Sequence, residues 1–382
     1  MRNFTYHNPV KLVFGKGSIA ELGSLVPRDA AILMTYGGGS IKKNGVYDQV
    51  KAALKGIHWL EFSGIEPNPQ YDTLMKGVEL ARKNKIDFLL AVGGGSVLDG
   101  TKFMSAAIPF KGPEPWDIME GKASIDVALP VGCVMTLPAT GSEMNRFAVV
   151  SRDATHQKLA INNEKLAPRF SILDPETAYS LPDRQVTNGI VDTWMHAVEQ
   201  YLTYPLDTPL QDRQAEAILQ TLLEEAPKVF KNPRDYNVRA NLMWCATHAL
   251  NGLLACGGIS DWTSHRLGYE LTVLYGIDHA QSLAILFPAV LRHEKANKIE
   301  KLVQYGRRVF GIQDTPERTA DLAIAKTVEF FRSVGMKTRL ADYGIPASDF
   351  DKILGKFKPA DRLGERRTID KQGILEILQL CD

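Results

Sequence analysis

The sequence predicts a two-part protein, with an N-terminal α/β domain followed by an all-α C-terminal domain. Up to about residue 180, short apolar runs alternate with amphipathic stretches, and each run ends in Gly, Pro or Asp. After about residue 182 the strand pattern fades and helical periodicity takes over. Strand–helix alternation is typical of a parallel sheet covered by helices. Pro182 and Asp183 favour a new helix start, so we expect one domain over residues 1–181 and a second over 182–382.

Composition and charge exclude several classes of protein. The 382 residues are 45% hydrophobic and 23% charged, which is typical of a folded chain. Lys and Arg number 45 against 44 Asp and Glu, so the whole molecule has no attraction for nucleic acid or for anionic lipid. The longest apolar run, Ser282–Leu291, is too short to cross a bilayer. The sequence therefore predicts a protein with neither a nucleic-acid nor a membrane partner.

The N-terminus and the cysteines predict a cytoplasmic location. Met1–Phe4 begins no apolar segment that resembles a signal peptide. The four cysteines contain no CxxC pair, and a chain of this size needs no disulfide framework. We expect reduced, buried thiols.

Four apolar runs predict strands in the first domain. Runs of four to six apolar residues without alternating polar ones suit strands that are buried on both faces. A helical pattern over Leu74, Val78 and Ala81 precedes the second run. The predicted strands are 31–36, 88–92, 134–137 and 170–173.

Helix-length periodic segments fill the second domain. Gly, Pro, Asn and Asp separate them, and no linker is rich in Gly or Ser. Firm packing of the domains would place the site in the cleft between them, where ligand sites are commonly found. The predicted helices are 190–202, 210–229, 241–255, 263–275, 299–309 and 319–334.

Two predicted strands end in Gly-Gly-Gly-Ser, at residues 37–40 and 93–96. At the second, a glycine turn leads from a strongly apolar strand into an amphipathic helix. Such a turn leaves backbone N–H groups open to a pyrophosphate at the helix N-terminus. Gly94, Gly95 and Ser96 are candidate cofactor residues; a purely structural turn, with Ser96 as N-cap and Asp99 favouring the first helical turn, is the alternative. Neither segment matches GxGxxG.

The first glycine turn bears on the choice of dinucleotide. Sites that select NAD place an acid against the ribose 2′-hydroxyl, whereas this segment offers Gly37, Gly38, Ser40, Lys42 and Lys43. The composition suits a 2′-phosphate and hence NADP(H). An exposed basic turn without a ligand accounts for the same residues.

A metal site is the second chemical hypothesis. Asp192 and His196 are four residues apart and share a helix face among apolar neighbours. His265 and His279 follow. Three imidazoles and one carboxylate suit Fe²⁺ or Zn²⁺. Hydrogen-bonded core histidines are the alternative, and we assign that role to the remaining histidines.

Taken together, the motifs resemble the iron-containing (group III) alcohol dehydrogenases, and most closely their NADPH-dependent butanol dehydrogenase and aldehyde reductase branch. The motifs occur in the family's order over most of the chain. The matching segments are Phe14–Gly17, Tyr36–Ser40, Glu66–Pro69, Gly93–Asp99, Thr136–Glu143, Asp192 with His196, and His265 through His279.

The resemblance implies a dinucleotide-binding first domain and a metal-binding helical second domain, in the architecture of dehydroquinate synthase. It implies that Asp192, His196, His265 and His279 hold one divalent metal. It also implies a homodimer, with residues 3–13 contributing to the contact. Along the cofactor it places Gly38, Ser40, Asn68, Gly94, Gly95, Ser96, Asp99, Thr136, Thr140, Asn145 and Lys158.

One position departs from the family pattern. Related reductases often have a second histidine four residues after the metal-binding His265, and Tyr269 stands there. A tyrosine with a reference pKa near 10 is a poor proton donor at neutral pH. Solvent, a cofactor ribose hydroxyl or Tyr269 itself could therefore deliver the proton. Alternatively, Tyr269 is a wall of the substrate pocket.

We expect a metal-dependent oxidoreductase that interconverts small aldehydes and primary alcohols with NADP(H), acting as an aldehyde reductase. Trp194, Met195, Trp262, Leu267 and Tyr269 lie near the metal motifs in sequence and favour neutral or apolar substrates. A phosphorylated acid, as a dehydroquinate-synthase-like lyase would take, needs more basic residues there. The alternatives are a glycerol-type polyol dehydrogenase and a non-catalytic nucleotide- or metal-binding relative.

Overall fold

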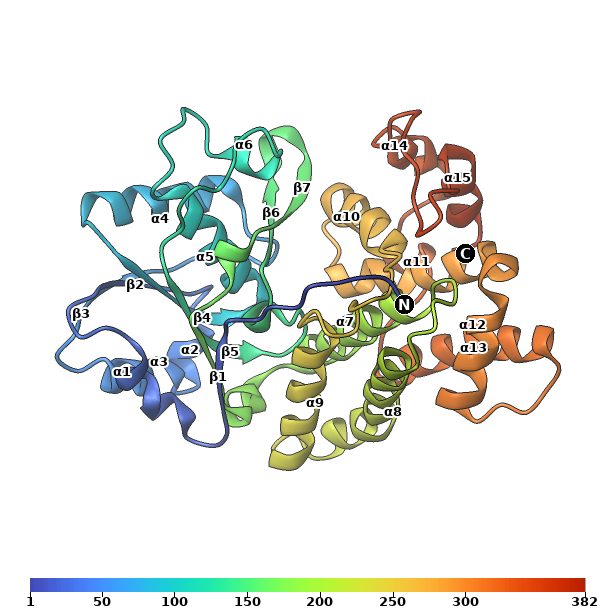
Figure 1. Cartoon of the computed structure of the whole chain (residues 1–382), viewed down its shortest axis with the longest axis horizontal. Coiled ribbons are helices and arrows are strands. Elements are labelled where there is room, and N and C mark those ends of the chain that lie inside the picture. Colours follow the sequence, from blue (N-terminus) through green and yellow to red (C-terminus); the bar gives the residue numbers. More distant parts are fainter. Residues whose placement is uncertain (382) are drawn as a thin grey trace. The chain divides into compact units, whose positions relative to one another are not determined.

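The computed structural model describes residues 1–381 and confirms the predicted fold class, an α/β part and a helical part (Figure 1). The chain forms two compact units. The α/β unit comprises His7–Pro182 and Pro233–Thr247. The helical unit comprises Met1–Tyr6, Asp183–Asn232 and the residues from His248 onward.

A six-stranded parallel sheet is the centre of the α/β unit. Its strand order is β1-β8-β5-β4-β2-β3, so the chain crosses over repeatedly between parallel neighbours. Parallel pairing requires crossover connections, which the helices between the strands provide. The strands are β1 (Lys11–Phe14), β2 (Ala31–Thr35), β3 (His58–Phe62), β4 (Phe88–Gly94), β5 (Val131–Leu137) and β8 (Phe170–Leu173).

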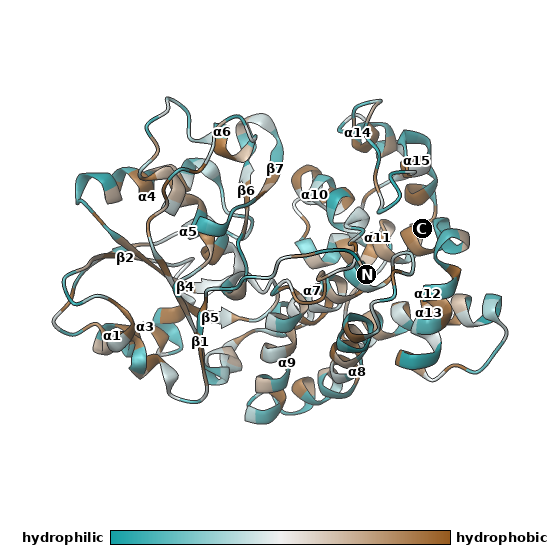
Figure 2. Cartoon of the chain, viewed as in Figure 1, coloured by the Kyte–Doolittle hydropathy of each residue, from teal (hydrophilic) through white to brown (hydrophobic). Residues whose placement is uncertain are grey.

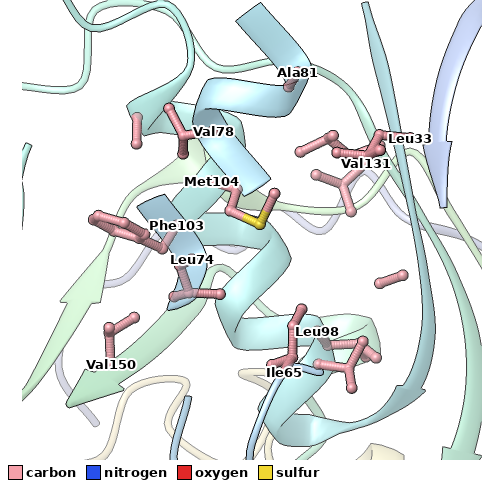
Figure 3. Close-up of a cluster of buried hydrophobic side chains, with 14 of the residues drawn as sticks. Leu33, Ile65, Leu74, Val78, Ala81, Leu98, Phe103, Met104, Val131 and Val150 are labelled. Carbon is pink, nitrogen blue, oxygen red and sulfur yellow. The ribbon is translucent and has the colours of Figure 1, made fainter. Parts of the chain in front are cut away.

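Both faces of this sheet are covered, which explains the uninterrupted apolar runs. Successive side chains of a strand point to opposite faces. Leu89 and Ala91 of β4 therefore pack with the helices on one face, and Leu90 and Val92 pack on the other. Figure 3 shows the first of these clusters, in which Met104 lies among side chains from neighbouring elements.

Helices α1 to α6, most of α9 (Tyr236–Ala249) and one hairpin complete the α/β unit. Strands β6 (Phe147–Arg152) and β7 (Gln157–Asn162) pair antiparallel, and Val150 of β6 joins the same apolar cluster as Phe103 of α5. The helices are α1 (Leu22–Leu25), α2 (Ser40–Lys43), α3 (Val46–Ala53), α4 (Tyr71–Lys83), α5 (Gly95–Ala107) and α6 (Trp116–Met119).

Several helices after Pro182 have one polar and one apolar face, as Figure 2 shows for α8 and α12. Helix α7 begins directly after Pro182, as the Pro-Asp pair predicts. The helices are α7 (Asp183–Tyr201), α8 (Pro209–Lys231), α9 (Tyr236–Ala249), α10 (Thr263–Tyr275), α11 (His279–His293), α12 (Lys295–Phe310), α13 (Pro316–Ser333), α14 (Phe350–Leu354) and α15 (Lys371–Gln379).

Helix α11 is absent from the helices predicted above. It contains the apolar run Ser282–Leu291, and ten of these residues in succession are buried. The stretch Leu283–Leu291 contains no charged or strongly polar residue that would mark an exposed helix face, and Pro288 within it argues against a helix in sequence. Among residues 1–381, no helix combines the length and apolar character that crossing a membrane requires.

Several boundaries also differ from expectation. Helix α9 ends at Ala249 rather than at residue 255, and turns follow it. Strands β1, β3, β6 and β7 were not among the four predicted strands. Their polar residues alternate with apolar ones or lie at the ends, because β1 and β3 are the edge strands of the sheet and β6 and β7 form a separate two-stranded ribbon.

Candidate functional site

Three helices of the helical unit bring the four predicted metal ligands together. Asp192 and His196 lie one turn apart on α7, His265 lies in the first turn of α10, and His279 is the first residue of α11. Ligand atoms of Asp192, His265 and His279 lie within 4.8 Å of one another. His196 joins them, since its Nε2 is 3.8 Å from Asp192 Oδ1 and its ring centroid is 4.9 Å from that of His265.

The start of α11 is anchored to α7, which places His279. Asp278 caps α11 and accepts two hydrogen bonds from the Arg184 guanidinium, each of 2.8 Å. Asn188 Nδ2 donates a third, of 2.7 Å. Asp278 therefore ties the N-terminus of α11 to the first turns of α7. His279 Nε2 then lies 3.9 Å from Asp192 Oδ1.

The cluster contains buried polar atoms that call for a cation. Asp192 Oδ1 and His265 Nε2 are both buried without a hydrogen-bond partner among the described residues. An unpaired buried carboxylate is costly. Three imidazoles and one carboxylate at these distances form a donor set that suits a divalent transition metal. The residues present therefore fit one such ion.

Glu199 is a member of this site that our sequence reasoning missed. It follows His196 by three residues on α7, so both lie on one helix face. Its Oε2 pairs with His265 Nδ1, and its Oε1 accepts a 2.7 Å hydrogen bond from the Ser264 N–H. The i, i+3 spacing from His196 was the available signal.

Only two of the five residues expected around the metal motifs contact the cluster's rings. The Trp262 ring lies 5.1 Å from that of His265, and the Tyr269 ring lies 5.6 Å from that of His279. Trp194 is instead fully buried against Phe330, at 4.5 Å between ring centroids. Met195 and Leu267 are also core residues. Neighbours in a helical sequence point in different directions, so proximity along the chain does not place them at the site.

In the α/β unit, β4 ends at Gly94 and α5 begins at Gly95, as the second glycine turn predicts. The glycines also serve packing. A Cβ on Gly93 would lie 2.6 Å from the Val97 side chain, and one on Gly95 would lie 2.5 Å from that of Thr140. The helix N-terminus at the end of a buried strand is the arrangement that binds pyrophosphate, and close packing adds a second reason for glycine.

Three of the predicted cofactor residues meet beside this turn. The Asn68 N–H donates to Ser96 Oγ at 3.3 Å, and Lys158 Nζ donates to Asn68 Oδ1 at 2.8 Å. Asn68 adopts a left-handed conformation with φ of 57°, which asparagine tolerates better than most residues. Lys158 is buried and supplies positive charge at this point.

A second group of predicted residues surrounds Lys102, a buried lysine that sequence reasoning did not select. Lys102 Nζ donates to Ser142 Oγ at 2.9 Å and to Asn145 Oδ1 at 3.1 Å. Ser142 Oγ donates in turn to Asp99 Oδ1 at 2.5 Å. Burial raises the pKa of Asp99 and lowers that of Lys102. Through Ser142, Asp99 therefore links the N-terminal half of α5 to the segment that contains Ser142 and Asn145.

Thr136 and Thr140 lie at and after the end of β5, the strand beside β4. Thr140 Oγ1 accepts from the Ser142 N–H at 3.2 Å, and the Thr140 carbonyl accepts from Asn145 Nδ2 at 3.4 Å. Because carboxyl ends of parallel strands share one edge of a sheet, these residues and the Gly93–Ser96 turn lie at the same edge.

An acidic residue lies close to the first glycine turn, and the sequence alone did not reveal it. Gly38 and Ser40 are exposed, and a Cβ on Gly38 would meet nothing within 4 Å. Lys42 Nζ pairs with Glu61 at 3.3 Å, and Tyr36 donates to the same carboxylate at 2.8 Å. Glu61 comes from β3, more than twenty residues along the chain, so only strand pairing brings it here.

Comparison with known proteins follows these observations. Residues 9–175 match the family described as iron-containing alcohol dehydrogenase. Residues 186–380 match the C-terminal domain of the Fe-containing alcohol dehydrogenase family. The NADPH-dependent aldehyde reductase YqhD of Escherichia coli strain K12 is 51% identical over 374 residues, which are 97% of each chain.

Solved structures agree with this assignment. The crystal structure of E. coli K-12 YqhD has a TM-score of 0.98 and 49% identity, and covers 100% of this chain and 99% of its own. An NADH-dependent butanol dehydrogenase A from Thermotoga maritima has a TM-score of 0.95 and 37% identity, with coverage of 100% and 99%. The chain therefore belongs to the iron-containing alcohol dehydrogenase family.

Proposed function

We propose that the protein is a metal-dependent oxidoreductase that interconverts aldehydes and primary alcohols with NADP(H), and that it acts as an aldehyde reductase. The buried cluster of Asp192 with three histidines carries this proposal, because its orphaned oxygen and nitrogen atoms need a cation. Family membership and the printed activity of the E. coli relative support it.

Asp192, His196, His265 and His279 would hold one divalent ion, Fe²⁺ or Zn²⁺. An ion there would supply Lewis acidity to a carbonyl oxygen. The single carboxylate lowers the net positive charge of the site while the three neutral imidazoles leave most of it in place. Trp262 and Tyr269 lie against the rings of His265 and His279 and would contribute aromatic surface beside the ion. Elemental analysis of freshly purified protein would identify the metal.

The cofactor would lie along the strand edge of the α/β unit, within residues 1–181, and the helical part over 182–382 would provide the metal. NADP(H) supplies the hydride. The α5 N-terminus and Lys158 provide positive potential for phosphate. Gly38, where a Cβ would meet nothing within 4 Å, and the exposed Ser40 would accept a 2′-phosphate, with Gly37 beside them. Gly94, Gly95, Ser96, Asn68, Asp99, Thr136, Thr140 and Asn145 complete the proposed cofactor set.

Tyr269 would act as a wall of the substrate pocket rather than as a proton relay. Its ring lies against His279, a proposed metal ligand, at 5.6 Å between centroids. A pocket wall needs the ring and not the hydroxyl group. Tyr269→Phe should therefore retain most of the turnover, whereas a loss of about 10²-fold or more is expected of a proton donor.

Two further assignments concern the protein in the cell. We propose a homodimer that forms through the edge strand β1, where Phe14 is exposed beside Trp244. We propose a cytoplasmic location, with which four buried cysteine thiols agree. Light scattering after size exclusion would measure the first and cell fractionation the second; a monomer or a secreted protein would contradict them.

The main test is an assay of NADPH oxidation with butanal on metal-stripped protein, with and without added Fe²⁺ or Zn²⁺. Turnover should depend on the metal. His265→Ala should lose most of its metal affinity and about 10³-fold of kcat/KM, the effect of several kcal/mol at the transition state. His293→Ala, at the other end of α11, is the matched control and should retain both.

Three outcomes would contradict the proposal. Metal-independent turnover in His265→Ala would exclude the metal mechanism. Preference for glycerol over butanol in the reverse direction would favour a polyol dehydrogenase. Absence of turnover with every aldehyde despite bound NADPH would favour a non-catalytic binding protein. Equal kcat/KM for NADH and NADPH would overturn only the proposed NADP preference. This comparison tests the first glycine turn, where Lys42 pairs with Glu61.

A further inference from the structure

Glu199 contacts the segment that carries His265 at three points. Its backbone carbonyl accepts from the Asp261 N–H at 2.8 Å. Its Oε1 accepts from the Ser264 N–H at 2.7 Å, and its Oε2 pairs with His265 Nδ1. The Glu199 side chain is 2% exposed, so these contacts form in a protected environment.

This pairing determines which nitrogen of His265 carries the proton. A carboxylate accepts hydrogen bonds and cannot donate them. Nδ1 of His265 must therefore be the donor, and in the neutral imidazole that metal binding requires, Nε2 carries the lone pair. Nε2 is the nitrogen that is buried without a hydrogen-bond partner. The imidazole is thus held in the tautomer that can bind a cation through Nε2.

The backbone at this point requires such restraint. Trp262, three residues before His265, has φ of 62°, which is unfavourable for an aromatic residue. Asp261 Oδ1 accepts from the Thr263 N–H at 3.0 Å, directly after this residue. Since the Asp261 N–H is bound to the Glu199 carbonyl, one residue of α7 restrains the chain on both sides of Trp262.

We infer that Glu199 is a positioning residue for the metal site, which sets the tautomer and orientation of His265. This inference rests on the proposed metal site. Because Glu199 shares α7 with Asp192 and His196, it holds the ligand from α10 in register with the two ligands from its own helix.

Glu199→Gln tests the inference with minimal change of shape. A glutamine side chain has one acceptor and one donor group. If the glutamine oxygen accepts the hydrogen bond from the Ser264 N–H, the glutamine NH₂ group faces His265 Nδ1. Nδ1 must then accept a hydrogen bond, so the imidazole proton lies on Nε2. The imidazole would present an N–H to the cation instead of a lone pair.

Glu294→Gln is the matched control. Glu294 is also a buried carboxylate of the helical unit, 7% exposed, and it pairs with His293 Nδ1 at 2.8 Å. It lies at the far end of α11 from His279, about 20 Å along the helix axis. Both variants remove one carboxylate–histidine pair, but only Glu199→Gln removes one at the metal ligands.

The measurement is the dissociation constant for Zn²⁺, from chelator competition on metal-stripped full-length protein. Glu199→Gln should bind Zn²⁺ about 10- to 100-fold more weakly than wild type. Glu294→Gln should match wild type. In a His265→Ala background, adding Glu199→Gln should cause no further loss, because Glu199 acts through that histidine.

Wild-type Zn²⁺ affinity in Glu199→Gln would overturn the inference while leaving the proposed metal site intact. An equal loss in Glu294→Gln, or an additive loss in the His265→Ala background, would also overturn it. Failure of the wild-type protein to bind Zn²⁺ would instead overturn the metal site, and the inference with it. If Glu199→Gln does not fold, Glu199→Asp carries the test, since its shorter carboxylate cannot reach both Ser264 and His265.

Discussion

Lys102 in the α/β unit and Lys298 in the helical unit are 0% and 2% exposed, and the two lysines have different surroundings. In the α/β unit, Lys102 donates to four oxygen atoms of three residues, Ser142, Asn145 and Phe147, none of which is a carboxylate. In the helical unit, Lys298 binds the carboxylates of Asp261 and Glu365, both at 2.8 Å.

The different surroundings shift the pKa values of Lys102 and Lys298 in opposite directions. Burial lowers the pKa of Lys102, and the more distant carboxylate of Asp99 opposes this only in part. Burial would also lower the pKa of Lys298, but the charges of Asp261 and Glu365 raise it. Lys102 is thus a buried ammonium that is held by hydrogen bonds to neutral acceptors. Lys298 is held by two carboxylates and forms a compensated ion cluster with them.

Both lysines support residues that the proposed function needs. Lys102 holds the segment from Ser142 to Phe147 against α5, and this segment includes Asn145. Lys298 holds Asp261, which precedes the restrained turn before His265. The same side chain, buried to the same degree, therefore positions a proposed cofactor residue in one unit and the approach to a proposed metal ligand in the other.

Lys298→Met should have the largest effect on stability. It leaves two buried carboxylates without a counter-charge, which costs about 3–5 kcal/mol of unfolding free energy. Urea unfolding followed by circular dichroism would measure this. Lys295→Met is the control, because Lys295 lies on the same helix in a more exposed pair with Asp321 and should cost about 1 kcal/mol or less. Similar losses in the two variants would contradict the compensated ion cluster.

Lys102→Met should have a smaller effect on stability and a specific one on the cofactor. The oxygen atoms of Ser142 and Asn145 lose a donor, at a cost of about 2–3 kcal/mol. Asp99 still accepts from Ser142 and from the Val149 N–H. NADPH should bind more weakly, as measured by fluorescence titration, while the Zn²⁺ dissociation constant stays unchanged. A greater loss of stability than in Lys298→Met would reverse the comparison.

His248 should give the smallest effect, a dependence of stability on pH. Burial lowers its pKa below the ordinary value of 6.5. Above pH 6.5 both the folded and the unfolded states hold it neutral. As pH falls below 6.5, the unfolded state takes up a proton first, so stability falls until the folded pKa is reached. His248→Gln should reduce the loss in Tm between one unit above and one unit below 6.5, and an unchanged loss would contradict this assignment.

The predictable features of the site were those with a local pattern. Asp192 and His196 share a helix face at i, i+4 spacing, and the structure places them 3.8 Å apart. The predicted helix over 263–275 matches α10, because Gly276 ends it in a left-handed conformation. The glycine turn at 93–96 follows a fully apolar strand, and β4 and α5 meet there.

Other features had no local pattern to detect. Glu61 reaches Lys42 only through the pairing of β3 with β2. Lys102 reads as an ordinary polar residue of an amphipathic helix, yet it is fully buried, because β6 and the segment before it cover that face of α5. Every side of the central part of helix α11 is buried, so the stretch Leu283–Leu291 has no polar residue to mark an exposed face.

The amino-acid sequence alone determined the class of the fold, the glycine turns and the Asp192–His196 pair, since these depend on periodicity and residue type over a few turns of chain. The family resemblance of the sequence motifs assigned His265 and His279 to the same metal site as this pair. Only the tertiary structure decided which buried charges compensate one another. The partners of Lys298 lie 37 and 67 residues away, and that of Glu199 lies 66 residues away. The burial that makes these contacts strong arises when distant helices pack, so no local stretch of sequence contains it.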